Sequence, residues 1–142
     1  MKALLLGAAA AMAITGAGLA QDFTLNPNFG STSLSAGFLP DPFEVSIAAG
    51  GSVNASGVGC AGMISQAPDY RLQWNGGRIK IGARASQDTT LVINAPNGQW
   101  FCSDDVNGLD PELVLSGSGQ YDIWVGTFGG GIAQSTLYIT EY

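Results

Sequence analysis

The chain has 142 residues, of which 46% are apolar and 11% are charged, and its formal net charge is −6. This length corresponds to one small domain, and the apolar content is too high for a disordered chain. The sequence contains no histidine, so the usual general base of a Ser-His-Asp hydrolase and the commonest metal ligand are both missing. Five basic residues in an acidic chain also argue against a nucleic-acid partner.

The first twenty residues have the layout of a secretory signal peptide. Lys2 precedes an uncharged run rich in Ala and Leu, which ends in small residues at Ala20, just before the polar Gln21. We therefore predict a signal peptide over residues 1–20 and a single mature domain over residues 21–142, in a secreted or periplasmic location. The alternative is an N-terminal membrane anchor. The run is short, however, and no second apolar stretch of spanning length follows it, so an integral membrane protein is not expected.

Export changes the meaning of the two cysteines. Loss of Lys2 leaves four basic side chains against eleven acidic ones, a formal net charge of −7 for the mature chain. In an oxidising compartment, Cys60 and Cys102 are the only candidates to pair with each other, at a sequence separation of 42. Closing a loop of this size stabilises the folded state by about 4 kcal/mol in the chain-entropy model. The alternative is two buried free thiols, which are less common outside the cytoplasm.

Short segments of alternating apolar and polar residues run along the mature chain, separated by clusters of Gly, Pro, Asn and Asp, which is typical of β-strands. Strands are predicted around Thr32–Phe38, Phe43–Ile47, Tyr70–Trp74, Ile79–Ala83, Thr89–Ile93, Trp100–Cys102, Leu113–Leu115, Tyr121–Val125 and Leu137–Ile139. The continuous β-branched run at Thr89–Ile93 is expected to be the most deeply buried. About eight short strands without an amphipathic helix favour an all-β fold, an antiparallel β-sandwich of the jelly-roll type.

Two turn sequences are expected to close hairpins. Asn75-Gly76-Gly77 follows a strand and gives a strong hairpin signal. The Gly-rich stretch Phe128–Gly131 is expected to join the last two strands in the same way. Arg78, Lys80 and Arg84 lie on the second strand of the first predicted hairpin. We interpret these three side chains as a solvated outer face of a sheet and not as a binding patch.

The most informative segment is an acidic turn over residues 102–111, where carboxylate and amide oxygens crowd together. Asp104, Asp105, Asn107 and Asp110 supply these oxygens. Calcium prefers such donors, completed by backbone carbonyls and water. Alternatively, the side chains cap the turn by hydrogen bonds to the backbone, as Asx residues commonly do. Asx-rich turns are more frequent than calcium loops, so capping is the favoured interpretation, and both stay open.

No residue pattern indicates an enzyme. Lys80 is the only lysine of the mature chain and lies on a strand expected to be exposed. Paired carboxylates for glycoside hydrolysis meet in space and not along the chain, so a small hydrolase that uses the Asp104-Asp105 turn stays an alternative. Aromatic side chains on strands can bind sugars or proteins, and Trp74, Trp124 and Tyr138 are candidates, although core packing is the more frequent role.

The segment from Asp88 to Asp105 resembles the bacterial pre-peptidase C-terminal domain family, in which an Asp-Thr strand leads through a Pro-x-Gly turn to an Asp-Asp turn. Residues Gly119–Phe128 are similar to the family's Gly-x-Tyr strand, which ends in Val-Gly. The motifs cover residues 88–142 well and the rest of the mature chain loosely. The resemblance implies a jelly-roll β-sandwich that is usually an accessory domain of secreted proteases, with roles in export, adhesion or substrate binding.

The resemblance also sets functional expectations. Similar stand-alone proteins are often labelled as peptidases by association, but no residue of this chain supports that activity. Some related collagen-binding sandwiches bind calcium, and the resemblance places it at Asp88, Asp104 and Asp105; no other cofactor is expected. We expect an exported, non-enzymatic binding or structural domain that contacts a protein or polysaccharide of the cell envelope or its surroundings. An accessory partner of a secreted protease is the alternative.

Overall fold

The computed structural model describes residues 20–106 and 108–142, and its regular elements are β-strands apart from one short 3-10 helix. The predicted signal peptide lies outside the described residues except for Ala20. A four-stranded sheet has the order β10-β7-β12-β3, with bounds Glu112–Ser116, Arg78–Ala85, Ala133–Thr140 and Phe43–Ala49. None of the helices in the described part of the chain is long and apolar enough to cross a membrane.

The second sheet has seven strands, and β11 is its central strand. Its members are β2 (Ser31–Ser35), β4 (Val53–Asn54), β5 (Met63–Ile64), β6 (Tyr70–Asn75), β8 (Thr89–Asn94), β9 (Trp100–Ser103) and β11 (Gly119–Thr127). The first half of β11 pairs with β6, its second half pairs with β8, and its last residue pairs with β5. β9 extends the sheet beyond β8, and β2 extends it beyond β6 in parallel.

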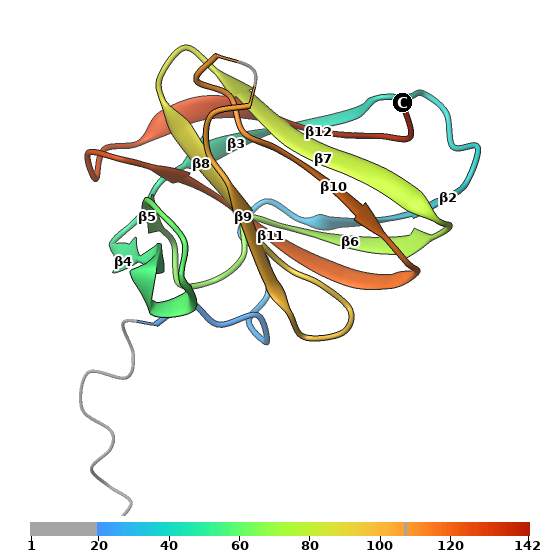
Figure 1. The fold of residues 1–142 in the computed structure, drawn as a ribbon, viewed down its shortest axis with the longest axis horizontal. Helices are drawn as coiled ribbons and strands as arrows, with labels where there is room; N and C mark the ends of the chain where they lie inside the picture. Colours follow the sequence, from blue (N-terminus) through green and yellow to red (C-terminus); the bar gives the residue numbers. More distant parts are fainter. Residues whose placement is uncertain (1–19, 107) are drawn as a thin grey trace, which may run out of the picture.

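The two sheets pack face to face around the main core (Figure 1). Because side chains alternate across a strand, each sheet turns its apolar residues inward and its polar residues outward. The fully buried residues of this core include Leu72, Ile79, Ile81, Leu91, Ile93, Ile123, Leu137 and Ile139. Every residue of β8 is buried, as its β-branched run predicts. The predicted all-β sandwich is confirmed.

Both predicted hairpins are wrong. Asn75-Gly76-Gly77 joins β6 to β7, and the loop after Thr127 joins β11 to β12, yet in each case the two strands belong to different sheets. Each turn therefore carries the chain across the sandwich. The turn between β8 and β9 is a true hairpin, with Ile93 opposite Phe101. A turn sequence shows that the chain reverses its direction. The alternation of apolar and polar residues in the next strand is the same whether that strand joins the sheet of the preceding strand or the facing sheet.

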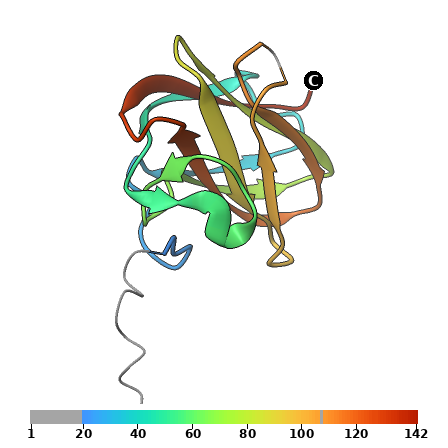
Figure 2. The ribbon, with the colours of Figure 1, turned by 60° about the vertical axis from the view of Figure 1, so that its left-hand side comes forward.

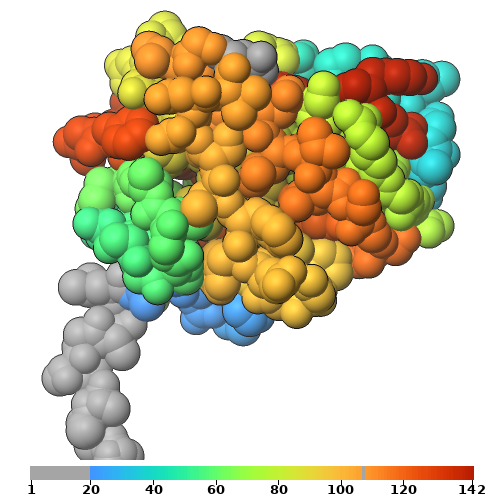
Figure 3. All heavy atoms as spheres, in the orientation of Figure 1, coloured from blue at the N-terminus to red at the C-terminus, as the bar shows by residue number. Residues whose placement is uncertain are grey.

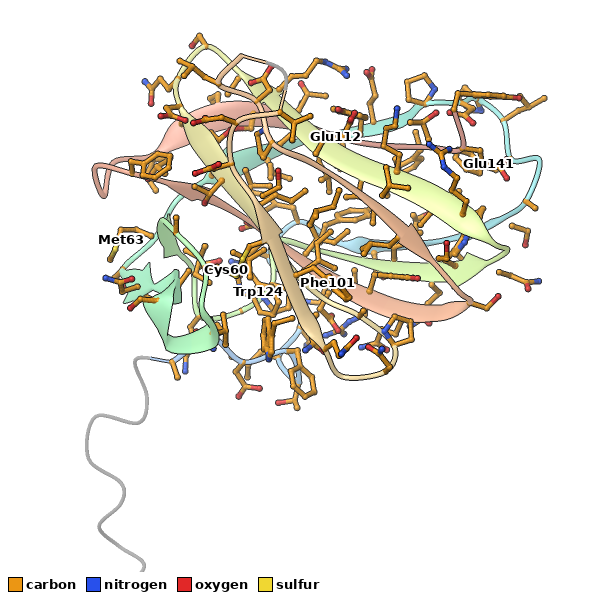
Figure 4. The ribbon with its side chains drawn as sticks, viewed as in Figure 1. Cys60, Met63, Phe101, Glu112, Trp124 and Glu141 are labelled. Carbon is orange, nitrogen blue, oxygen red and sulfur yellow. A yellow bond between two sulfur atoms is a disulfide. The ribbon has the colours of Figure 1, made fainter. Side chains whose placement is uncertain are left out.

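The outer face of the larger sheet carries a second, smaller core. The excursion over residues 53–64, which contains β4, the 3-10 helix Ala55–Val58 and β5, folds over β8 and β11 (Figure 2). Its apolar side chains pack around Val92 and Trp124. A disulfide between Cys60 and Cys102, whose Cα atoms are 5.6 Å apart, fastens the excursion to β9, as predicted. Figure 4 shows Cys60 beside Trp124 in this layer.

The three aromatic residues named from sequence as candidate ligand contacts are buried, so they have the structural role that is more frequent for aromatic residues on strands. Trp124 is 0% exposed, Trp74 2% and Tyr138 8%. Trp74 faces the main core, and Trp124 lies beneath the excursion. Tyr138 donates its hydroxyl to Glu112 at 2.7 Å and lies under the guanidinium of Arg84. Each of these rings therefore packs against other parts of the protein.

The basic residues of β7 are held by acidic or carbonyl partners, as expected for a solvated face. Arg84 forms an ion pair with Glu44, and Lys80 lies 3.9 Å from Glu112. Arg78 donates to the carbonyl of Glu141 at 3.1 Å. No basic patch results on this face.

Candidate functional site

The acidic residues predicted from sequence gather at one end of the sandwich, where the β7–β8 turn meets the β9–β10 loop (Figure 1). Asp88 belongs to the turn, and Asp104 and Asp105 belong to the loop. Partial desolvation, followed by the negative charges of Asp88 and Asp104, raises the pKa of Asp105. The fold therefore brings Asp88 and Asp104 close enough to Asp105 for their charges to act on its carboxyl group.

The acidic end fits a cation only in part. In the described residues no group of three or more Asp, Glu, Cys or His side chains is arranged to hold a metal ion, and Asn107 lies outside those residues. One carboxylate oxygen of Asp88 is buried without a hydrogen-bond partner, which is the feature that a calcium ion would satisfy. Asp104 accepts the backbone N–H of Asp105 at 2.7 Å, and Asp110 accepts that of Ala85 at 3.2 Å. These two contacts are caps, and calcium binding by Asp88, Asp104 and Asp105 stays a proposal.

A second candidate site lies at the opposite end of β8, on the outer face of the larger sheet. The strand registers place five residues in one row across β9, β8, β11, β6 and β2, namely Trp100, Asn94, Asp122, Arg71 and Ser31. Gln120 faces Gln73 in the next row. Because their neighbours along each strand fill the main core, these side chains point away from it.

Hydrogen bonds join the polar members of these rows. Arg71 donates its Nε–H to Asp122 at 2.6 Å, and the Asp122 side chain is only 2% exposed. Gln120 donates to the second carboxylate oxygen of Asp122 at 2.9 Å and accepts a hydrogen bond from Gln73, also at 2.9 Å. Asn94, which is 5% exposed, donates to a carbonyl of the β8–β9 turn at 3.1 Å. The ion pair at the centre leaves this surface electrically balanced.

The segment over residues 21–29 lies beside this polar surface. Arg71 donates from Nη2 to the carbonyls of Phe23 and Leu25, at 2.8 and 3.0 Å. Asn28 and Phe29 donate their backbone N–H groups to carbonyls of the strand entry at residues 68 and 69, both at 2.8 Å. In Figure 3 this segment (blue) lies at the lower edge of the molecule, next to the β8–β9 turn (yellow-orange). Asp22 also donates its backbone N–H to the carbonyl of Gln66 at 2.7 Å, so five hydrogen bonds join the described segment to the rest of the domain.

Three aromatic rings continue from this segment into the protein. The ring centroids of Phe23 and Trp100 are 6.3 Å apart, and those of Trp100 and the buried Trp124 are 5.3 Å apart. Phe23 is 42% exposed. The outermost ring is therefore open to solvent and is supported from behind.

A groove of about 350 Å³ lies between Phe23 and the β8–β9 turn. Its lining residues are Phe23, Asn94, Ala95, Pro96, Gly98, Gly119, Gln120 and Asp122. A second hollow, of about 250 Å³, shares Ala95 and Pro96 with it and opens toward Phe101 and Tyr121 at the end of the main core. Among the described residues, Asp122 is the only ionisable side chain that lines the first groove.

The sequence analysis did not identify this groove. Its residues come from three separate segments, and only the register of β8, β9 and β11 brings them together. One signal was present in the sequence: Asn94 and Asp122 each lie next to a run of apolar residues on their strands and are polar at outward positions.

No protein-family model matches the chain, and no curated protein matches it in sequence. Two solved structures have a similar outline. The pre-peptidase C-terminal domain of a collagenase from Bacillus anthracis is 12% identical with a TM-score of 0.45, over 82% of this chain and 100% of that chain. PliG from Aeromonas hydrophila, a periplasmic inhibitor of g-type lysozyme, is 14% identical with a TM-score of 0.42, over 78% of this chain and 96% of that chain. Likenesses of this degree do not establish a family for the chain.

Proposed function

We propose that this chain is an exported, non-enzymatic binding domain for a protein or polysaccharide of the cell envelope or its surroundings. Its binding site is the groove beside Phe23. The observation that carries the proposal is the combination of an open, supported aromatic ring with a hydrogen-bonded polar floor. The Cys60–Cys102 disulfide supports a secreted or periplasmic location, because such bonds persist in oxidising compartments.

The chemistry of the groove supports binding over catalysis. Asp122, its only ionisable side chain among the described residues, pairs with Arg71 at 2.6 Å through one carboxylate oxygen and accepts a hydrogen bond from Gln120 at 2.9 Å through the other, so both oxygens already have partners within the protein. The alternative of a small hydrolase requires two carboxylates on either side of one bond. Asp104 and Asp105 lie instead on one loop at the far end of β8, where Asp104 already caps the backbone.

Retention by envelope fractions tests this proposal. Purified residues 21–142, oxidised, should be retained by envelopes of the native host, and Phe23→Ala should release the domain because the open ring is lost. Phe128→Ala is the matched control, since Phe128 is 45% exposed on the β11–β12 loop, away from the groove. Absence of retention, or equal retention of the two variants, would contradict the proposal. Protease treatment of the envelopes separates a protein partner, including a secreted protease, from a polysaccharide.

A further inference from the structure

We infer that the ligand of the Phe23 groove is a neutral oligosaccharide, with one sugar ring stacked on Phe23 and its hydroxyl groups bonded to Asn94 and Gln120. This inference rests on the proposed function and names the ligand class of the same site. It follows from four properties of the groove: its aromatic wall, its free hydrogen-bonding groups, its charge and its size.

The aromatic wall is rigid before any ligand arrives. Arg71 fixes the backbone on which Phe23 stands, and Trp100 and Trp124 support its ring. Phe23 still exposes 42% of its surface. A flat apolar face of this kind suits the C–H face of a sugar ring. Because the ring is already immobilised, binding does not have to order it.

The polar floor offers both donors and acceptors. Asn94 uses one amide hydrogen within the protein, and among the described residues no hydrogen bond uses its Oδ1 or its other amide hydrogen. Gln120 uses its Oε1 and one amide hydrogen, which leaves the second hydrogen free. A hydroxyl group both donates and accepts, so neighbouring hydroxyls on a sugar ring match this mixed set. An apolar peptide side chain would leave these groups without partners, at a cost in free energy.

The charge balance selects an uncharged ligand. Arg71 and Asp122 neutralise each other beneath the groove, so an ionic ligand would lose hydration without gaining a free counter-charge. Acidic ligands are also repelled by the net negative charge of the domain, because residues 21–142 contain eleven acidic and four basic side chains. Neutral sugars avoid both costs.

The size of the groove suits a small part of a polymer. A volume of about 350 Å³ is at the lower end of the range for small-molecule sites. The second hollow, of about 250 Å³ beyond Pro96, provides a place for the next ring. We therefore expect a chain of at least two sugar rings that passes over Pro96.

Direct titration with defined sugars tests the inference. The probes are the tetrasaccharides of β1,4-linked N-acetylglucosamine, β1,4-linked glucose and α1,4-linked glucose, with tetragalacturonate as the acidic counterpart. Binding of residues 21–142 is followed by calorimetry up to about 10 mM sugar, since single shallow sites often bind in the millimolar range. At least one neutral sugar should bind, and tetragalacturonate should not.

Variants at exposed positions locate the site. Phe23→Ala should weaken binding by about tenfold or more, as expected when a central aromatic anchor is truncated. Gln120→Ala should weaken it by about threefold, because one hydrogen bond to a hydroxyl is lost. The matched controls Phe128→Ala and Gln134→Ala change an exposed ring and an exposed amide elsewhere and should leave binding within about twofold. Equal thermal melts of all four variants show that each is folded.

Several results would overturn the inference. They are the failure of every neutral sugar to bind, preference for tetragalacturonate, or equal affinities of Phe23→Ala and its control. Envelope retention that still depends on Phe23, without sugar binding, would leave the proposed function intact and assign the groove to a protein partner. If the wild type neither is retained by envelopes nor binds a sugar, both the proposed function and the proposed sugar ligand are wrong.

Discussion

The buried carboxylate of Asp69 gives the sharpest prediction about stability. Asp69 is 1% exposed and lies where β11 has left β6 and has not yet reached β5. There its carboxylate accepts a hydrogen bond from the backbone N–H of Val125 at 2.7 Å, which takes the place of a bond from Val125 to a neighbouring strand. It also accepts a longer hydrogen bond, at 3.3 Å, from the hydroxyl of Ser65. Burial raises the pKa of Asp69 from 3.8 to about 7, and the two hydrogen bonds oppose that rise only in part.

The folded state therefore binds a proton more tightly than the unfolded state does. The contribution of Asp69 to the free energy of unfolding is greatest below pH 4, falls as the pH rises through the folded pKa of about 7, and is constant above it. Each pKa unit corresponds to about 1.4 kcal/mol, so the contribution should fall by about 3 kcal/mol between pH 5 and pH 8.

The variant Asp69→Asn isolates this contribution. An amide oxygen still accepts the N–H of Val125 but carries no charge, so the wild type should lose stability relative to Asp69→Asn as the pH rises. Urea unfolding followed by tryptophan fluorescence at pH 5, 6, 7 and 8 measures the difference. Asp69→Ala, which also removes the acceptor, should be less stable than Asp69→Asn at every pH by about 1–3 kcal/mol. Parallel pH profiles of the wild type and Asp69→Asn would refute the reasoning.

Three further changes probe other parts of the molecule. Cys102→Ser should lower the free energy of unfolding by about 2–4 kcal/mol because the disulfide is lost. A reductant should destabilise the wild type but not the variant. Equal effects of the reductant on both proteins would contradict a stabilising role for the disulfide. If calcium binds the buried oxygen of Asp88, calcium at ten times its dissociation constant should stabilise the wild type by about 1.4 kcal/mol in a thermal melt. Asp105→Asn or EDTA should abolish this gain. Melts that calcium does not change would leave the turn with a capping role alone. Gly82→Ala should lower the free energy of unfolding by about 1–3 kcal/mol because the new Cβ would overlap the Tyr138 ring. Gly77→Ala should lower it much less, because the space around its Cβ is open. Similar losses of stability at the two positions would argue against this packing.

The local structure of this protein could be predicted because it depends on neighbours in sequence. Alternation with period two identified the strands, and the β-branched run identified β8 as fully buried. The chain has two cysteines, so one intramolecular pairing was possible, and the disulfide between Cys60 and Cys102 confirms it. The same reasoning missed the excursion over residues 53–64, because its two-residue strands are too short to show a period.

Partners across the sandwich could not be predicted. Trp124 occupies an outward position on β11 and is buried because the excursion over residues 53–64 covers it, a contact that the sequence pattern of β11 does not reveal. The site beside Phe23 depends on the same kind of information, since residue 23 meets Trp100 only after four strands have paired in register. At the acidic end, by contrast, Asp88 and the Asp104-Asp105 turn are close together, as the family resemblance implies, because β8 and β9 form a true hairpin.

The crossings between sheets also determine the order in which the chain can fold. In the part of the chain that the structure describes, β3 pairs only with β12, and β6 pairs with β11, so neither sheet is complete until residues 119–140 are available. Pairings between such distant segments form slowly, and unpaired strand edges are open to aggregation in the meantime. A chain ending before Ala133 should therefore fail to fold.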